Sequence, residues 1–529
     1  MSDNKRETFL KGAAILGVAG VIVKVLGAAF RIPLVWIITS VGLGYYQTAY
    51  PIYVVLVGIA TSGFPVAISK MVSERRVVGN YKGADKVFWL IFKILIVFGL
   101  IASAGIFFGA DYIVNEKLHN PKAYLAMKSL APALLIVPIM AAFRGYFQGH
   151  NDMRPSALSQ IVEQVARVVF GLGLAWLFVP KGLEYGAAGG TFGATAGALA
   201  GLGVMLYMYF RKRNRPEEMI HEGRFEEEPN SKILREMLQI ALPIIIGALV
   251  MPVMVLIDLA LVLRRLEEIG FTNEQANALY GQLTGMVATL VNLPQVVTSA
   301  IAISLVPIIA SAFTTKDHEK LRDNTSLGIR VSLLIGLPAG VGLFALATPI
   351  MMMLFPKEPT SVGEILAITS VGVVFLSIIQ STTSILQGMG RAHIPVINLF
   401  IGALVKFVLT YILTGIPSLN VKGAAISTVS AYIVAACLDY IAVRSRVDFK
   451  FDLKQFVIGP IITVGLMGIS ARGAYELVYM ATTRNSVSVL AGIMVGIAVY
   501  AVVLLKTGTI TKQELDHLRS SRRGSSKAV

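Results

Sequence analysis

Long apolar stretches separated by short polar intervals dominate this chain of 529 residues. A helix needs about 20 mostly apolar residues to cross a membrane, and about fourteen stretches meet that requirement. They begin near Leu10, Tyr46, Val87, Tyr124, Pro155, Ala187, Ile233, Ala278, Leu327, Ile365, Ile394, Ala424, Phe456 and Val487. The longest polar interval, 211–235, is too short to fold as a soluble domain. The sequence therefore predicts an all-α integral membrane protein with about fourteen transmembrane helices.

The composition agrees with this prediction and argues against several other classes of protein. Charged residues make up 15% of the chain, whereas soluble proteins carry about 25%. The single cysteine, Cys437, excludes an internal disulfide framework, and the six histidines lie apart without the spacing of metal ligands. The sequence has no Walker loop to hold ATP and no long polar loop with paired carboxylates. We therefore expect neither an enzyme nor a bound cofactor, apart from a coupling ion.

The net charge of +16 is divided unevenly between the two sides of the membrane. With the N-terminus inside, inner segments hold about 31 Lys and Arg residues and outer loops hold about nine, so we expect both termini to be cytoplasmic. The positive charge thus reflects membrane topology rather than binding to nucleic acid. The loop 211–235 and the tail after Lys506 can also contact anionic lipid headgroups, although the acidic run 226–228 favours a role in topology alone.

An internal repeat divides most of the chain into two halves. Four landmarks recur in the same order at an offset of about 237 to 240 residues. They are Phe147-Gln148-Gly149 and Leu386-Gln387-Gly388, Pro155 and Pro395, Arg167 and Lys406, and Gly186-Ala187-Ala188 and Gly423-Ala424-Ala425. Two six-helix lobes with the same orientation and a central cleft are the architecture of a transporter. The predicted parts are an N-terminal lobe (1–212), a cytoplasmic linker (213–232), a C-terminal lobe (233–446), two extra helices (447–507) and a basic tail (508–529), and we expect a monomer.

Two cations lie within the first apolar stretch, where charge is costly. Lys24 and Arg31 are seven residues apart, which places them two turns apart on one helix face, with Gly27 between them. No acid on that helix neutralises either residue. Two such cations either face a water-filled cleft as an anion site or pair with a distant helix, and the pattern favours the anion site.

Three further cations and one acid lie in later apolar stretches. Arg144 is near the end of its stretch, Arg167 can pair with Glu163 one turn earlier, and Lys406 has no acid nearby on its own helix. Lys406 can therefore line a cavity or pair across helices. Asp258 is a lone acid that can pair with a cavity cation or coordinate a coupling cation. Because these residues are mostly basic, the cleft is predicted to bind an anion, with phosphate the obvious candidate. The candidate substrate residues are Lys24, Arg31, Arg144, Arg167 and Lys406.

Several short motifs resemble those of one transporter family. The stretch Lys24-Val25-Leu26-Gly27 with Arg31 resembles the first helix of the lipid II flippases. The run Leu293-Pro294 through Leu305-Val306-Pro307 is similar to a later part of the same family. Residues 62–70, which begin Ser62-Gly63-Phe64-Pro65, look like the Gram-positive branch of polysaccharide transporters that includes stage V sporulation protein B. The resemblance extends over essentially the whole chain.

The resemblance implies a multidrug-exporter-like fold in which the two extra helices form a groove for a lipid tail. It implies that Lys24 and Arg31 hold the pyrophosphate of an undecaprenyl-linked peptidoglycan precursor, lipid II. Thr61 and Thr289 stand where family members carry further arginines. It also implies a sodium ion at Asp258, with the site completed by Asn398 and Thr428, while Gly402 stands where a second acid is expected.

These expectations together describe a flippase of the bacterial cytoplasmic membrane that serves cell-wall biogenesis and cell shape. It would turn lipid II from the inner to the outer leaflet by alternating access, driven by a cation gradient or by the membrane potential. Two alternatives remain open. One is a flippase for another lipid-linked polysaccharide precursor, and the other is a cation-coupled multidrug exporter of the same fold, which should show acid-lined lobes.

Overall fold

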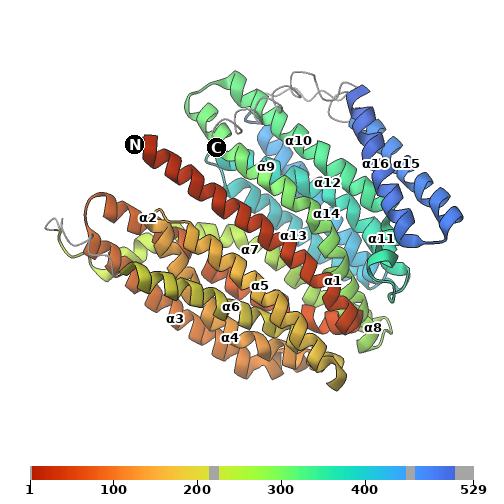
Figure 1. The fold of residues 1–529 in the computed structure, drawn as a ribbon, viewed down its shortest axis with the longest axis horizontal. Coiled ribbons are helices and arrows are strands. Elements are labelled where there is room, and N and C mark those ends of the chain that lie inside the picture. The colour runs from red at the N-terminus through yellow and green to blue at the C-terminus, as the bar shows by residue number, and fades with distance from the viewer. Residues whose placement is uncertain (1–2, 214–224, 448–458, 507–529) are drawn as a thin grey trace. The chain divides into compact units, whose positions relative to one another are not determined.

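The structure, a computed structural model, describes residues 3–213, 225–447 and 459–506, and this part of the chain is helical almost throughout with no β-strand (Figure 1). The helices are α1 (Asp3–Ser62), α2 (Phe64–Val77), α3 (Tyr81–Tyr112), α4 (Tyr124–Gly149), α5 (Arg154–Phe178), α6 (Leu183–Arg213), α7 (Asn230–Glu268), α8 (Asn273–Gly281), α9 (Ala288–Thr314), α10 (His318–Ala345), α11 (Ala347–Leu354), α12 (Ser361–Gly388), α13 (His393–Thr414), α14 (Val421–Arg444), α15 (Gly459–Thr482) and α16 (Asn485–Lys506). A π-helical segment, Gln282–Val287, joins α8 to α9.

Helix α1 consists of two helices that meet at Thr39. Its 60 residues would extend about 90 Å if they were straight, three times the thickness of the hydrocarbon core. Thr39 has φ 59° and ψ −179°, a conformation that essentially only glycine adopts readily. Thirteen helices in the described part are long and apolar enough to cross a membrane, and the first of these includes both parts of α1. Dividing it at Thr39 adds one crossing and agrees with the predicted number.

The part of α1 that follows Thr39 packs closely on α8. A Cβ atom at Gly44 would lie 2.2 Å from the backbone oxygen of Asn277, so only glycine fits there. The side chain of Asn277 accepts a hydrogen bond of 2.7 Å from Asn120, which also donates to Thr48 at 2.8 Å. The residues near the start of the second helix of α1 are therefore held by backbone contact and by buried hydrogen bonds.

Two compact units make up the described part of the chain. The first comprises Met1–Val296 with Leu399–Ser427, and the second comprises Val297–Asn398 with Thr428–Val529. Helices α9, α13 and α14 contribute residues to both units. The lobe boundaries expected at 212 and 446 stay predictions.

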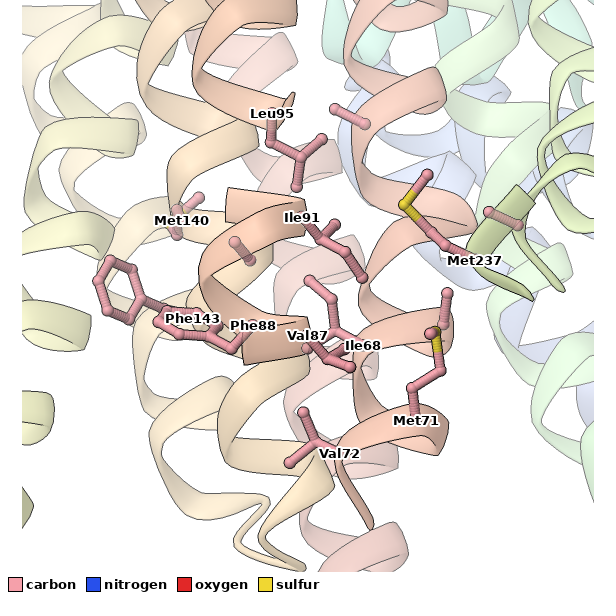
Figure 2. Packing of buried hydrophobic residues seen from close by; sticks show 14 of the residues in the cluster. Ile68, Met71, Val72, Val87, Phe88, Ile91, Leu95, Met140, Phe143 and Met237 are labelled. Atoms are coloured by element: carbon pink, nitrogen blue, oxygen red, sulfur yellow. The ribbon is translucent and has the colours of Figure 1, made fainter. Parts of the chain in front are cut away.

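The core of the first unit joins α2, α3, α4 and α7, as Figure 2 shows. Phe88 packs against Phe143 and Tyr146, with ring centroids 5.5 Å and 4.7 Å apart. Met237 adds α7 to the same cluster. Helices in a membrane associate through close packing of this kind, because lipid offers no hydrophobic drive for their assembly. Since Phe143 precedes Arg144 in sequence, the cluster also fixes the rotation of α4 that presents Arg144.

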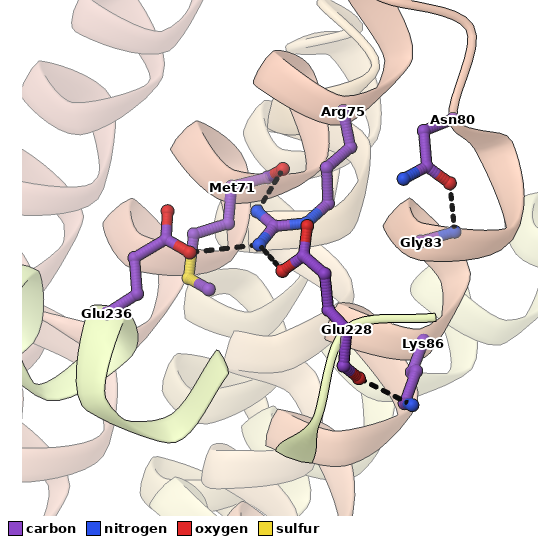
Figure 3. A network of polar contacts seen from close by, with 7 residues as sticks. All are labelled: Met71, Arg75, Asn80, Gly83, Lys86, Glu228 and Glu236. Carbon is purple, nitrogen blue, oxygen red and sulfur yellow. Dashed lines mark hydrogen bonds and ion pairs between the residues drawn. The ribbon is translucent and has the colours of Figure 1, made fainter. Parts of the chain in front are cut away.

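The segment that precedes α7 is tied to α2 and α3 by ion pairs (Figure 3). Arg75 pairs with Glu228 at 2.6 Å and Glu236 at 2.9 Å. Lys86 bonds the side chain of Glu227 and the backbone oxygen of Glu228, each at 2.7 Å. The hydrogen bond from Lys86 holds the pKa of Glu227 below its usual range. Two acids of the run 226–228 thus bind within the protein, while residues 214–224 of the linker lie outside the described part.

The second unit is held by buried hydroxyl groups on α12 and by the pair α15 and α16. Ser381 of α12 bonds Ser332 of α10 within the unit's interior. Tyr500 of α16 donates to the backbone oxygen of Leu334 at 2.7 Å, and Asn485 donates to that of Pro349 at 3.0 Å. Helices α15 and α16 therefore rest on α10 and α11, and their role as a lipid-tail groove stays a prediction. The span expected near Phe456 begins at Gly459 in the described part.

Candidate substrate cavity

A polar cavity of about 390 Å³ lies inside the first unit among α1, α4, α5 and α7. Its lining includes both arginines predicted on α4 and α5. The polar lining residues are Tyr50, Tyr53, Thr61, Ser62, Arg144, Gln160, Glu163, Gln164 and Arg167. A space of this volume that is lined by polar side chains inside an apolar helix bundle is a candidate binding site for a polar ligand.

Helical spacing explains why these side chains converge. On α1, Tyr50, Tyr53, Val57 and Thr61 recur every three or four residues and share one face. On α5, residues 160, 163, 164 and 167 follow the same rule. Because both helices turn a polar face toward one space, the cavity is a consequence of sequence periodicity on two helices.

Three charged side chains of the lining form a cluster. Glu163 bridges the two arginines, with one carboxylate oxygen 2.9 Å from Arg144 Nη2 and the other 3.0 Å from Arg167 Nη2. Arg144 also donates from Nε to Ser159 at 3.0 Å. Each of the three charged side chains is 13–15% exposed. Two cations and one anion leave the cluster with a net positive charge, which favours an anionic ligand.

Arg167 keeps hydrogen-bonding capacity that the described residues do not fill. Its Nη1 lies 3.5 Å from the hydroxyl of Tyr50, at the limit of a hydrogen bond, and its buried Nε has no partner among the described residues. Tyr50 stacks on Tyr46 with ring centroids 5.2 Å apart, which fixes the position of its hydroxyl. Since a guanidinium presents five N–H donors, Arg167 can bind further acceptor oxygens while it keeps Glu163.

Close packing between α5 and α6 sets the position of Glu163 and Arg167. A Cβ at Gly193 would lie 2.7 Å from the backbone oxygen of Arg167, and one at Gly197 would lie 2.6 Å from that of Glu163. Small residues four apart let two membrane helices approach to backbone contact. The two glycines of α6 therefore hold the backbone of α5 at the residues that carry the charges.

Replacing Gly197 with Leu is expected to displace α5 and destabilise the protein by about 3 kcal/mol, since a bulky side chain overlaps backbone atoms there. The measurement is the unfolding free energy of the purified protein in detergent. Gly203→Leu on the same helix is the control, because Gly203 is exposed and has no atom within 4 Å of its Cβ position. Equal stability of the two variants would contradict this account of α6.

Lys24 and Arg31, the two residues predicted to hold the pyrophosphate, lie outside the cavity lining. Lys24 is exposed, although the preceding residue, Val23, does line the cavity. Arg31 is half-buried and donates to Thr289 at 3.3 Å. Gly27 faces α5, where a Cβ would lie 3.5 Å from the side-chain amide of Gln164. The structure thus gathers Arg144 and Arg167 at one site, while Lys24 and Arg31 lie elsewhere along the first part of α1.

Lys406 and Asp258 pair with one another across helices. Lys406 Nζ lies 2.6 Å from Asp258 Oδ2, and the two residues are 2% and 6% exposed. Of the alternatives that the sequence left open for Lys406, the structure therefore shows pairing across helices. Asp258 meets a cation of the protein itself, and its other oxygen has no hydrogen-bond partner among the described residues.

Asn398 forms a hydrogen bond with Asp439, an acid that the sequence analysis did not identify as a candidate. It donates to Asp439 at 2.8 Å, and Asp439 is 1% exposed. Asp439 stands in an apolar stretch, so the criterion applied to Asp258 would also have found it. Thr428 is half-buried on the same helix, α14. In the described part, no three His, Cys, Asp or Glu side chains are grouped closely enough to hold a metal ion.

Comparisons with known proteins agree in both sequence and fold. The family model described as "Polysaccharide biosynthesis protein" matches residues 9–313, and the MatE model matches residues 283–412. The "Uncharacterized membrane protein YabM" of Bacillus subtilis is 30% identical over 97% of this chain and 95% of its own length. The "Stage V sporulation protein B" of Bacillus subtilis is 27% identical over 96% of this chain and 97% of its own length. The "Lipid II flippase MurJ" of the same organism is 28% identical over 88% of each chain.

Two solved structures share the fold. "Lipid II flippase MurJ, inward closed conformation" superimposes with a TM-score of 0.68 at 17% identity, over 93% of this chain and 98% of that one. An inward-facing multidrug resistance MATE family transporter also superimposes with a TM-score of 0.68 at 18% identity, over 80% of this chain and 94% of that one. The predicted all-α, multi-pass membrane fold is thereby confirmed, as is the resemblance to the flippase family.

Proposed function

The chain belongs to the polysaccharide biosynthesis protein family of membrane transporters, and on this premise we propose that it is a flippase for lipid II. Its relatives are transporters and flippases, so it is a transport protein and not an enzyme. In the proposed function it moves the undecaprenyl-pyrophosphate-linked peptidoglycan precursor from the inner to the outer leaflet of a bacterial cytoplasmic membrane. Both termini then face the cytoplasm, in keeping with the distribution of Lys and Arg.

The positively charged cavity is the observation that carries this proposal. Arg144 and Arg167 present planar guanidinium groups toward one space, and only one carboxylate, that of Glu163, offsets them. Arginine binds phosphate through paired N–H donors, and a pyrophosphate offers acceptor oxygens at both of its phosphorus atoms. The amides and hydroxyls of the lining can bind sugar hydroxyls next to the pyrophosphate. A polar cavity of this kind offsets the large cost of taking such a headgroup through hydrocarbon.

In the proposed mechanism, Lys24 and Arg31 add positive charge along the first part of α1. Lys406 remains paired with Asp258. Substrate would meet Arg144 and Arg167 in the cavity while the prenyl tail remains in lipid. A cation gradient or the membrane potential would drive the alternation between inward and outward access. The coupling sodium ion expected at Asp258 is part of this proposal only if Lys406 withdraws, because the Lys406 ammonium already pairs with the Asp258 carboxylate.

The proposal is tested in cells depleted of their own lipid II flippase. We expect the wild-type chain to restore growth and to lower the amount of lipid II in the inner leaflet. The Lys24→Ala/Arg31→Ala variant is expected to do so less well. Normal expression of the wild-type chain without restored translocation would contradict the proposal, and normal translocation by the double variant would remove Lys24 and Arg31 from the mechanism.

The family description favours one second candidate, a flippase for another lipid-linked polysaccharide precursor. Both substrates share a prenyl pyrophosphate, which the cavity recognises in the same way. Purified protein in liposomes, supplied with fluorescent lipid II or with a different lipid-linked glycan, separates the two. If the second lipid is transferred faster, it becomes the proposed substrate in place of the peptidoglycan precursor.

A further inference from the structure

Glu163 is an acid held between two cations in the wall of the cavity. One of its carboxylate oxygens accepts a hydrogen bond of 2.9 Å from Arg144 Nη2, and the other accepts one of 3.0 Å from Arg167 Nη2. Among the described lining residues it is the only carboxylate. The flippase proposal assigns the two arginines to the pyrophosphate, but it leaves open what happens to the acid between them when an anion binds.

An anionic headgroup places a second set of negative charges on the same two arginines. A pyrophosphate that is esterified at both ends carries two negative charges, and its oxygens bind the N–H donors of guanidinium groups. If Glu163 stays ionised, three negative charges then share two positive ones. Like charges in one site disfavour the charged form of the weaker acid. The carboxyl is a much weaker acid than an esterified phosphate, so the carboxyl takes up the proton.

The helices around Glu163 give its side chain no other cation to turn to. Helix α6 closes the space behind it, because a Cβ at Gly201 would lie 3.2 Å from the Cβ of Glu163. Apart from Arg144 and Arg167, the titratable side chains of the described lining are tyrosines, and tyrosine and arginine exchange protons only well above neutral pH. Glu163 is therefore the lining residue that can gain a proton near neutral pH. The other lining residues contributed by α1 and α7 near the charged cluster are Tyr50, Tyr53, Ala248 and Pro252.

We propose that Glu163 binds one proton when the anionic headgroup enters the cavity and releases it when the headgroup leaves. This inference rests on the proposed function, because it concerns the same cavity and the same charged ligand. The proton comes from water on the side where the headgroup enters, and the only bond that forms or breaks is the carboxyl O–H. The neutral carboxyl then donates its hydrogen to a phosphate oxygen instead of repelling it. Two arginine charges and two phosphate charges cancel, so the loaded cluster has no net charge.

The experiment measures ligand affinity and proton uptake of the purified full-length protein in detergent. The probe is geranyl pyrophosphate with its outer phosphate esterified to N-acetylglucosamine, because both phosphates then stay singly ionised near neutral pH. Since the bound state holds a proton that the free state lacks, binding weakens as the pH rises. We expect the dissociation constant of the wild type to increase about five- to tenfold for each pH unit near neutral pH. In a weakly buffered sample with a pH-sensitive dye, about one proton should be taken up for each probe molecule bound.

Three variants assign the proton to one residue. Glu163→Gln imitates the protonated carboxyl, so its dissociation constant should change by less than about twofold per pH unit and its proton uptake should be lost. Glu163→Asp keeps a carboxylate and should show both responses again. Glu476→Gln is the matched control, because Glu476 also pairs with an arginine one turn away, Arg472 at 2.7 Å, but is about half exposed. It should respond as the wild type does.

The outcomes separate this inference from the flippase proposal. If the wild type binds the probe with the same affinity at every pH and takes up no proton, the proton site is refuted and the proposed function stands. If Glu163→Gln keeps the response, the proton lies elsewhere and the assignment to Glu163 is wrong. A wild type that binds the probe at no pH contradicts the proposed function and this inference together. The measurement of proton uptake needs only the wild type, so it decides the question even if Glu163→Gln fails to fold.

Discussion

Replacing Lys406 with Met is expected to destabilise the protein by about 3–5 kcal/mol, because it leaves Asp258 as a buried charge without a partner. Lys406 is the one cation that pairs with Asp258 in the described part, and the remaining carboxylate oxygen has no hydrogen bond there to soften the loss. The measurement is the free energy of unfolding in detergent or lipid, compared with that of the wild type.

The double variant Lys406→Met/Asp258→Leu shows whether charge is the cause. Replacing both members of a buried pair with apolar residues is often neutral or stabilising, so most of the lost stability should return. Arg472→Met supplies the matched control, since Arg472 pairs with Glu476 at 2.7 Å but both side chains are about half exposed. We expect that variant to lose less than about 1 kcal/mol. A double variant no more stable than Lys406→Met would refute this explanation.

Replacing Arg144 and Arg167 together with Gln is expected to weaken binding of a prenyl pyrophosphate by a factor of about 100 to 10,000. Each charge-assisted hydrogen bond is worth about 1.5–3 kcal/mol, and each 1.4 kcal/mol changes affinity about tenfold. The measurement is the dissociation constant for a short-chain prenyl pyrophosphate in detergent, because such a probe keeps the charged group and removes the sugars.

A substitution at Glu163 is expected to change the affinity for the pyrophosphate in the opposite direction. Glu163→Gln removes the carboxylate that competes for both guanidinium groups, so affinity for the pyrophosphate should rise as that of the arginine variant falls. Lys93→Gln, which neutralises an exposed cation within α3, is the control and should bind as the wild type does. If affinity is unchanged in the arginine variant, the cavity does not hold the pyrophosphate.

The helices and the charged residues inside them could be predicted from the sequence, but not which charges meet. A long apolar stretch forms a helix in the membrane because lipid cannot bind the polar backbone, and this explains why the predicted crossings correspond to long helices of the described part. The starts are less exact, since α10 begins at His318 and not near Leu327. Pairing of Arg167 with Glu163 was also predictable, since both lie one turn apart on one helix. The contact of Lys406 with Asp258 joins residues 148 positions apart. It depends on tertiary packing, for which a single sequence contains no direct signal.

The lining of the cavity could also be predicted only in part from the sequence. The polar residues of α5 at 160, 163, 164 and 167 follow the helical repeat and mark a polar face in advance. Nothing in the sequence says that Tyr50 and Thr61 of α1 face the same space. The stripe of glycines in α6 marks a close contact but not its partner, and only the structure identifies α5 as that partner.

In the proposed mechanism, Glu163 also affects how the membrane potential acts on the carrier without substrate. After release of an anionic substrate, a carrier returns with whatever charge its binding site holds. Because Glu163 bridges Arg144 and Arg167, the cluster returns with one positive charge instead of two. A charge that crosses the whole field exchanges about 2.3 kcal/mol with the membrane for every 100 mV. The carboxylate is in this sense a resident counter-ion, which halves the electrical work on the unloaded cluster and leaves the return step half as sensitive to voltage.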